Sequence, residues 1–195
     1  MNYLAHALLS GPDDELRLGN FLGDFVKGRL ENYHGPFVTP RLRDGLRLHR
    51  LIDSFTDQHP VVRRSKSRLA PRYGLRAGVI VDLAYDHYLA RRWAQHGVGS
   101  LGKFSNDFYA LLKNNAHRYD ASLQGLVQAM SRSNWLAGYA ELEGLDRALG
   151  GMARRFPVAA GIDTAGEVIR SCYDEFGADF QEFFPAIREF CKPYW

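Results

Sequence analysis

The chain has 195 residues, enough for one compact domain with a substantial core and no need for two. Its apolar content of 46% and aromatic content of 13% fit a soluble globular protein, and no run approaches the roughly 18 apolar residues of a membrane helix. The formal net charge is only +3. The first residues lack the basic segment of a signal peptide, and Cys172 and Cys191 form no Cys-x-x-Cys pair, so we expect a reduced, cytoplasmic protein.

Apolar residues at helical spacing predict a first helix over residues 3–10, which Gly11 and Pro12 end. This helix carries His6. A single histidine in such a helix is most often a core residue with satisfied hydrogen bonds. Asp13 then offers a cap for a second helix.

Asp24 stands in the next segment, LGNFLGDFVKGRL, among apolar neighbours. A carboxylate in an apolar setting needs a cation, a donor or a metal, because unpaired burial costs several kcal/mol. Asp24 is therefore a candidate functional residue, and Asn20 could support it by hydrogen bonding. His34 follows in a connection and is interpreted as a surface residue.

Thr39 and Pro40 predict the start of a helix that runs to about residue 57. Within it, His49 and Asp53 are four residues apart and therefore share a face. An imidazole and a carboxylate on one face are ligand types suited to a divalent metal. The alternative for this motif alone is a polar, partly solvated helix end.

Basic residues are concentrated between positions 41 and 76, where ten Lys and Arg stand against three Asp. The local charge of +7 leaves −4 for the rest of the chain. Such a patch attracts an anionic partner or a phosphate-bearing substrate, although a solvated arginine-rich face explains it equally well. No recognised nucleic-acid-binding motif accompanies the arginines, so we expect neither nucleic acid nor a membrane as a partner.

The helical pattern LRAGVIVDLAYDHYLARRWAQH is apolar on most sides, which predicts a central helix. It contains Asp82, Asp86 and His87. Three ionisable groups in a buried helix are costly unless they are paired or bound to metal. The alternative to a metal site is a carboxylate network with Arg76 or Arg91.

The remaining pattern predicts helices over residues 101–116, 121–135 and 138–155, followed by a long last helix with an aromatic stripe that indicates core packing. No alternating strand pattern exceeds four residues. The sequence therefore predicts an all-α fold, a single-domain helical bundle over residues 1–195.

Five segments, in this order and along nearly the whole chain, resemble those of the acyl carrier protein phosphodiesterases: LAH (4–6), GNFLGDFVKG (19–28), HRLIDSFTD (49–57), DHYLARRW (86–93) and GMARR (151–155). This family looks like a divergent branch of the HD phosphohydrolases, all-α enzymes with His and Asp ligands around a divalent metal. The resemblance implies an HD-like fold and hydrolysis of the phosphodiester that joins 4′-phosphopantetheine to a serine of holo-acyl carrier protein. It also implies Mn²⁺ as the metal, with Mg²⁺ or another divalent ion as the alternative.

We therefore expect a metal site whose residues orient a water for in-line attack on phosphorus. The expected catalytic and metal-binding residues are Asp24, His49, Asp53, Asp86 and His87, with His6 or Asp82 beside them. The candidates for binding the phosphate or the acidic carrier protein are Lys27, Arg50, Arg63 and Arg64.

Two other functions fit the same residues. One is an HD-type nucleotide phosphohydrolase, which keeps the metal and takes a small substrate. The other is a non-catalytic helical adaptor that binds an acidic protein through residues 41–76. The oligomeric state and the number of metals stay open at this point.

Overall fold

The structure, a computed structural model, describes residues 1–33, 35, 37–155 and 157–195. His34 lies outside the described residues. Within them all regular structure is helical and no strand occurs, which confirms the all-α prediction. The α-helices are α1 (Tyr3–Leu9), α2 (Asp14–Leu22), α3 (Pro40–Gln58), α4 (Pro60–Tyr73), α5 (Ala77–Arg91), α6 (Trp93–His96), α7 (Leu101–Asn114), α8 (Ala121–Arg132), α9 (Trp135–Gly138), α10 (Leu142–Arg155), α11 (Ala165–Ser171) and α12 (Tyr173–Cys191).

The predicted helix starts follow from side-chain caps. Asp13 accepts a hydrogen bond from the backbone N–H of Leu16 at the start of α2, at 2.8 Å. Thr39 does the same for Leu42 at the start of α3, at 3.0 Å, with Pro40 as the first helical residue. Each cap satisfies one of the backbone donors that a helix N-terminus leaves without a partner.

Some predicted helices are divided. The expected helix over 121–135 ends at Arg132, and α9 begins after Asn134, whose φ of +43° is in the left-handed region. The long last helix is interrupted at Cys172, which separates α11 from α12. Helical periodicity persists across such breaks, so the sequence pattern alone does not reveal them.

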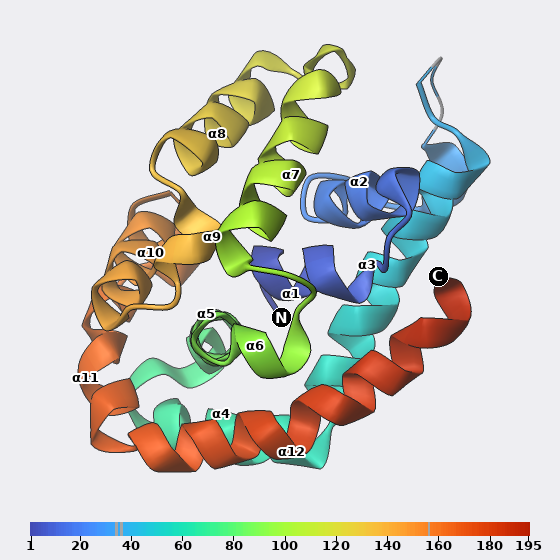
Figure 1. The fold of residues 1–195 in the computed structure, drawn as a ribbon. Helices are drawn as coiled ribbons and strands as arrows, with labels where there is room; N and C mark the ends of the chain where they lie inside the picture. Colours follow the sequence, from blue (N-terminus) through green and yellow to red (C-terminus); the bar gives the residue numbers. More distant parts are fainter. Residues whose placement is uncertain (34, 36, 156) are drawn as a thin grey trace.

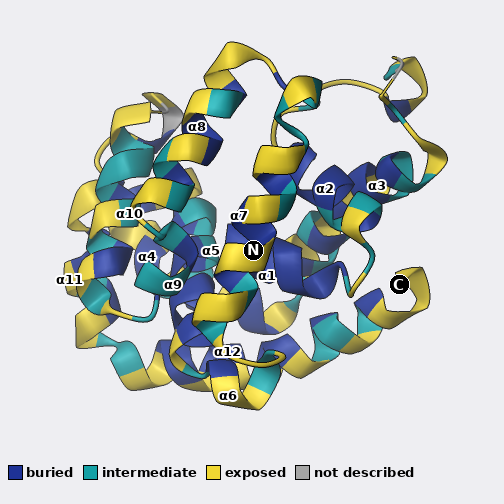
Figure 2. Ribbon diagram, turned by 45° about the horizontal axis from the view of Figure 1, so that its top comes forward, coloured by how far each residue is buried: buried dark blue, intermediate teal, exposed yellow. Residues whose placement is uncertain are grey.

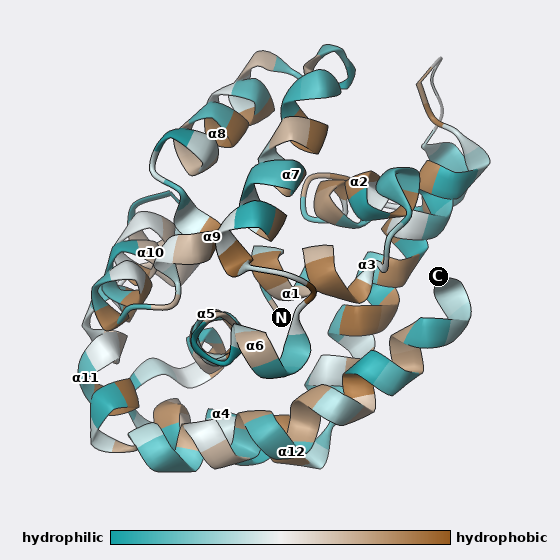
Figure 3. Ribbon diagram, viewed as in Figure 1, coloured by the Kyte–Doolittle hydropathy of each residue, from teal (hydrophilic) through white to brown (hydrophobic). Residues whose placement is uncertain are grey.

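Two helices occupy the centre of the molecule, α1 and α5 (Figures 1 and 2). All seven residues of α1 are buried, as are most residues of α5. Figure 3 shows α1 largely in the hydrophobic colour, whereas the outer helix α12 alternates between hydrophobic and hydrophilic residues. The predicted central helix is therefore confirmed, and α1 lies beside it.

Helices α2 and α3 cross at two glycines, Gly19 and Gly45. A Cβ atom at Gly19 would lie 2.0 Å from the carbonyl oxygen of Leu42, and one at Gly45 would lie 2.3 Å from that of Leu16. Only glycine permits this approach of the two backbones. The crossing brings the C-terminal half of α2 against the middle of α3, where His49 stands.

Helix α12 packs along α4 at the periphery, and Asp179 lies in their contact (Figure 1). The Asp179 side chain is 2% exposed. It accepts hydrogen bonds from Ser65 at 2.6 Å, from Arg64 at 2.6 Å and from Arg68 at 2.5 Å.

Buried apolar residues from α1 to α12 form one continuous cluster. On this basis we propose that residues 1–195 form a single domain. Within the part of the chain that the structure describes, no helix combines the length and the apolar character needed to cross a membrane.

Candidate metal centre

Three side chains from α1 and α3 converge on one point. The Nε2 atom of His6 lies 3.2 Å from Oδ1 of Asp53, and Nε2 of His49 lies 3.2 Å from Oδ2 of the same carboxylate. The two imidazole rings are stacked, with centroids 4.3 Å apart. All three possible ligand atoms lie within 4.8 Å of one another, close enough to hold one metal ion. We call His6, His49 and Asp53 the His-His-Asp cluster.

Asp24 lies beside this cluster, with its Oδ1 atom 3.6 Å from Nε2 of His49. The prediction of an apolar setting for Asp24 is wrong, because its side chain is 47% exposed. The reason is that α2 ends at Leu22, so Asp24 stands in the turn that follows and not on a helix packed into the core. Its exposure leaves the carboxylate accessible from solvent, next to the buried histidines.

The orientation of His6 is fixed by Asn20. The Asn20 amide group donates to the His6 carbonyl oxygen at 3.2 Å and to the Ser10 hydroxyl at 2.8 Å, so its Oδ1 atom faces Nδ1 of His6 at 2.7 Å. Nδ1 must then carry the proton, and in the neutral ring Nε2 presents its lone pair to the cluster. Asn20 thus supports His6, and not Asp24 as the sequence predicted.

Gly23 determines how closely the chain approaches His49. A Cβ atom at Gly23 would lie 2.1 Å from Cγ of the His49 ring. A glycine directly before Asp24 permits such a close approach, and the position of α3 identifies His49 as the residue that needs the space.

The close approach of His49 and Asp53 shifts the pKa of each side chain toward its charged form. Burial lowers the pKa of His49, but the adjacent carboxylates of Asp53 and Asp24 outweigh burial and raise this pKa above its usual value. Burial likewise opposes ionisation of Asp53, yet the hydrogen bond from His49 holds the pKa of this carboxyl well below its usual range. The ionised carboxylate is the form that binds a metal.

The other predicted ligands have different partners. Both oxygens of Asp86 accept backbone N–H groups at the start of α1, from Asn2 at 3.3 Å, Leu4 at 2.8 Å and Ala5 at 3.2 Å. Full burial raises the pKa of Asp86 to about 7 despite these donors. Asp82 pairs with the Met1 amino group at 2.7 Å.

His87 uses both ring nitrogens elsewhere. Nδ1 lies 2.8 Å from the Tyr139 carbonyl oxygen, to which it can only donate, and Nε2 lies 2.8 Å from the Tyr173 hydroxyl. Burial lowers the pKa of His87. The structure therefore brings together Asp24, His49, Asp53 and His6, whereas Asp82, Asp86 and His87 are bound to the other partners described above.

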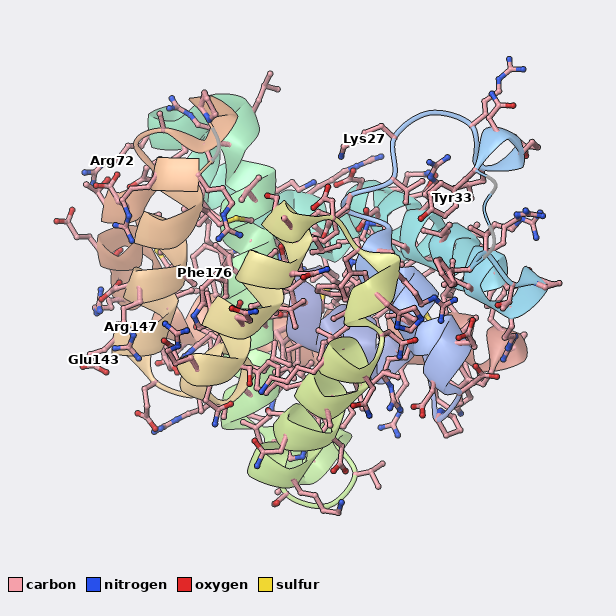
Figure 4. All side chains as sticks on the ribbon, turned by 90° about the horizontal axis from the view of Figure 1, so that it is seen from above. Lys27, Tyr33, Arg72, Glu143, Arg147 and Phe176 are labelled. Carbon is pink, nitrogen blue, oxygen red and sulfur yellow. The ribbon has the colours of Figure 1, made fainter. Side chains whose placement is uncertain are left out.

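An open cleft of about 1230 Å³ adjoins the cluster, with Asp24 and Asp82 on its wall. Its other walls come from the loop after α2, from α5 and from α8. Lys27 lines this cleft and projects from the loop after α2 (Figure 4).

The three arginines predicted to bind substrate are not among the residues that line this cleft. Arg50 donates to the carbonyl oxygen of Gly28 at 2.7 Å and so ties the Asp24 loop to α3. Arg64 pairs with Asp179 and with Glu182 of α12. Arg63 is exposed on α4.

A family model described as acyl carrier protein phosphodiesterase matches residues 1–187. The chain belongs to this family. A relative from Photorhabdus laumondii is 32% identical over 97% of this chain and 94% of its own length. Relatives from Serratia proteamaculans and Yersinia pestis are each 30% identical and are covered over 98% and 95% of their lengths. All three bear the name acyl carrier protein phosphodiesterase.

No solved structure matches this chain. The likeness to the HD phosphohydrolase fold therefore stays a prediction.

Proposed function

We propose that this chain is a metal-dependent phosphodiesterase that hydrolyses the bond between 4′-phosphopantetheine and the serine of holo-acyl carrier protein. Membership of the family supports the substrate and the reaction. The observation that supports a metal is the Nε2 atom of His6, which is buried and has no hydrogen-bond partner among the described residues. A buried nitrogen lone pair that faces a carboxylate is costly unless a cation lies between them.

The residues present fit a divalent metal. His6 and His49 each offer one nitrogen, Asp53 offers carboxylate oxygen, and Asp24 offers a further carboxylate from the cleft side. A mixed nitrogen and oxygen set of this kind suits Mn²⁺, which we propose as the metal, and it also admits other divalent ions. A bound divalent metal would lower the pKa of a coordinated water and neutralise phosphate charge.

Other side chains of the protein orient and position His6. His6 keeps its Nε2 free because Asn20 holds its Nδ1 proton, as the partners of metal-binding histidines commonly do. Asp86 fixes the N-terminus of α1 and thereby the position of His6, and we therefore propose it as a positioning residue and not as a ligand. His87 no longer belongs to the proposed site.

Lys27 is the cation that we propose to contact the phosphate or the acidic carrier protein, since it lines the cleft that contains Asp24. Arg50 donates to the carbonyl oxygens of Val26 and Gly28 and so holds the loop that carries Asp24 and Lys27. We propose that it affects the site only through this loop. The free thiols Cys172 and Cys191 fit the reducing cytoplasm in which we place the reaction.

Replacement of Asp24 tests the proposal. We expect Asp24→Ala to abolish release of 4′-phosphopantetheine from the holo carrier while the helical circular dichroism stays unchanged. The matched control is Asp14→Ala, which removes an exposed carboxylate from the start of α2 and should retain full activity. Near-normal turnover by Asp24→Ala would contradict the assignment, and turnover of small diesters alone would favour a nucleotide phosphohydrolase.

A further inference from the structure

A second, smaller pocket of about 260 Å³ lies next to the cleft. Apolar side chains from α5, α9 and α10 line it, with Leu83, Trp135 and Met152 among them. The buried Asn2 and Tyr139 add polar groups, and the Asn2 amide donates to the Tyr139 hydroxyl at 3.4 Å. The exposed Arg147, Arg154 and Arg155 add positive charge to the lining. Pockets that are mostly apolar with a few placed polar groups are typical sites for small organic groups.

The pocket and the cleft share one wall. The residues that line both are Asn2, Tyr3, Leu83, Met152 and Arg155. The pocket and the cleft are therefore direct neighbours, separated by no more than these side chains. Lys27 lines the cleft and Arg147 lines the pocket, and Figure 4 labels both side chains.

Tyr3 connects this wall to the His-His-Asp cluster, because it stands on α1 one turn before His6. Burial raises the pKa of the Tyr3 hydroxyl; the negative charge of Asp24 raises it further, and the positive charge of Arg155 lowers it. The Tyr3 side chain lines both the cleft and the pocket. Tyr3 lies between the proposed reaction site and the smaller pocket.

We propose that this pocket receives the thiol-bearing end of the phosphopantetheine arm while its phosphate lies at the His-His-Asp cluster. This inference rests on the proposed function. The arm is an uncharged chain with two methyl groups, two amides and a terminal thiol. Its mixed character matches a pocket with a tryptophan, a methionine and a leucine beside an amide and a hydroxyl.

Gly151 gives access to a direct test. It lies within α10, lines the pocket, and a Cβ atom added there would meet no other atom within 4 Å. A side chain can therefore begin at this position without a clash at its Cβ, and we expect a phenylalanine there to fill part of the pocket. Gly102 in α7 is the matched control, because its Cβ would also enter open space but the residue lines neither the pocket nor the cleft.

The first measurement is binding of pantetheine, the arm without its phosphate, detected by saturation-transfer NMR under reducing conditions. We expect a signal with the wild type and with Gly102→Phe, and its loss with Gly151→Phe. The second measurement is turnover of holo-acyl carrier protein, for which Gly151→Phe should raise KM by about tenfold or more. Circular dichroism and Mn²⁺ binding check that each variant retains the fold and the cluster.

Absence of a pantetheine signal with the wild type would overturn the inference, as would an equal signal from Gly151→Phe or an unchanged KM. Pantetheine binding that depends on Gly151 without any release from the carrier would support the pocket and contradict the proposed hydrolysis. The two proposals therefore fail in distinguishable ways.

Discussion

At the scale of single residues, the contact between Asn20 and His6 determines which nitrogen the cluster receives. If Asn20 is replaced by leucine, the Nδ1 proton of His6 loses its acceptor in a buried setting. We expect Asn20→Leu to raise the Kd for Mn²⁺ by about 10–100-fold, since partners of metal-binding histidines have effects of this size. Titration of the free Mn²⁺ signal in electron paramagnetic resonance measures this Kd.

Ser10→Ala provides the control for this prediction. It removes one acceptor of the Asn20 amide but leaves the contact between Asn20 and His6 in place. Its effect on the Kd should therefore be several-fold smaller. Equal affinity for Mn²⁺ in the wild type and in Asn20→Leu would show that Asn20 does not orient His6.

Some contacts of the predicted site residues could be inferred from the sequence, and others could not. His49 and Asp53 share one face of one helix, so their spacing was sufficient to predict that they meet. Asp86 and His87 have equally suggestive spacing, but their partners are Leu4 and Tyr139, more than fifty residues away in the chain. Only the tertiary structure reveals that these polar groups are already satisfied.

At the scale of elements, the crossing of α2 and α3 sets the position of His49 relative to Asn20. Gly45→Ala would place a Cβ 2.3 Å from the Leu16 carbonyl oxygen and force the two helices apart. We expect a loss of about 1–3 kcal/mol in the free energy of unfolding, measured by urea denaturation. Gly125→Ala in α8, where the Cβ would enter open space, should instead stabilise the fold by about 0.5–1 kcal/mol. Similar effects from the two substitutions would contradict a close helix crossing.

The contact between α4 and α12 predicts that the free energy of unfolding depends on pH. Burial opposes ionisation of Asp179, but the hydrogen bonds from Ser65, Arg64 and Arg68 outweigh it and lower the pKa of this carboxyl. A lowered pKa in the folded state gives stability that is present above the unfolded pKa of about 3.9 and is lost as the pH falls through the folded value.

Asp179→Asn should therefore cost about 3 kcal/mol of unfolding free energy at pH 7, because it leaves the buried hydroxyl and the arginines without a carboxylate. The difference from the wild type should shrink as the pH falls below about 4, where Asp179 itself becomes protonated. Urea denaturation at pH 7 and at pH 3 measures both values. A difference that does not change with pH would contradict the role of the ionised group.

The elements themselves were largely predictable from capping residues. Thr39 and Pro40 identified the start of α3, and Asp13 identified that of α2. The end of α2 at Leu22 has no signal in the apolar pattern, which continues through residues 25 and 26 while the helix does not. That one boundary explains why Asp24 was predicted to be buried and is exposed.

At the scale of the whole molecule, much of the excess positive charge of residues 41–76 is paired with carboxylates from other parts of the chain. Arg41 pairs with Asp13, Arg72 with Glu167, and Arg64 with two carboxylates of α12. A count of charges along the sequence could not show this, since the partners come from other helices. The segment is therefore less available to an acidic carrier protein than its local charge of +7 suggests.

Lys27 gives the corresponding prediction for the carrier. Because it lines the cleft beside Asp24, Lys27→Glu should raise KM for holo-acyl carrier protein by about fivefold to tenfold at low ionic strength, through repulsion of an acidic partner. The effect should decrease as added salt screens the charges. Lys113→Glu, an exposed change of the same sign on α7, should leave KM close to the wild-type value. An equal effect of both variants would indicate general charge repulsion and not a contact at the cleft.

The most direct test of the central claim is the intact mass of holo-acyl carrier protein after incubation with this protein. We predict that the carrier loses the mass of 4′-phosphopantetheine when Mn²⁺ is present and keeps it when a chelator has removed the metal, and that Asp53→Ala abolishes the loss. A carrier mass that stays unchanged with Mn²⁺, or that falls equally with chelator, would contradict a metal-dependent phosphodiesterase.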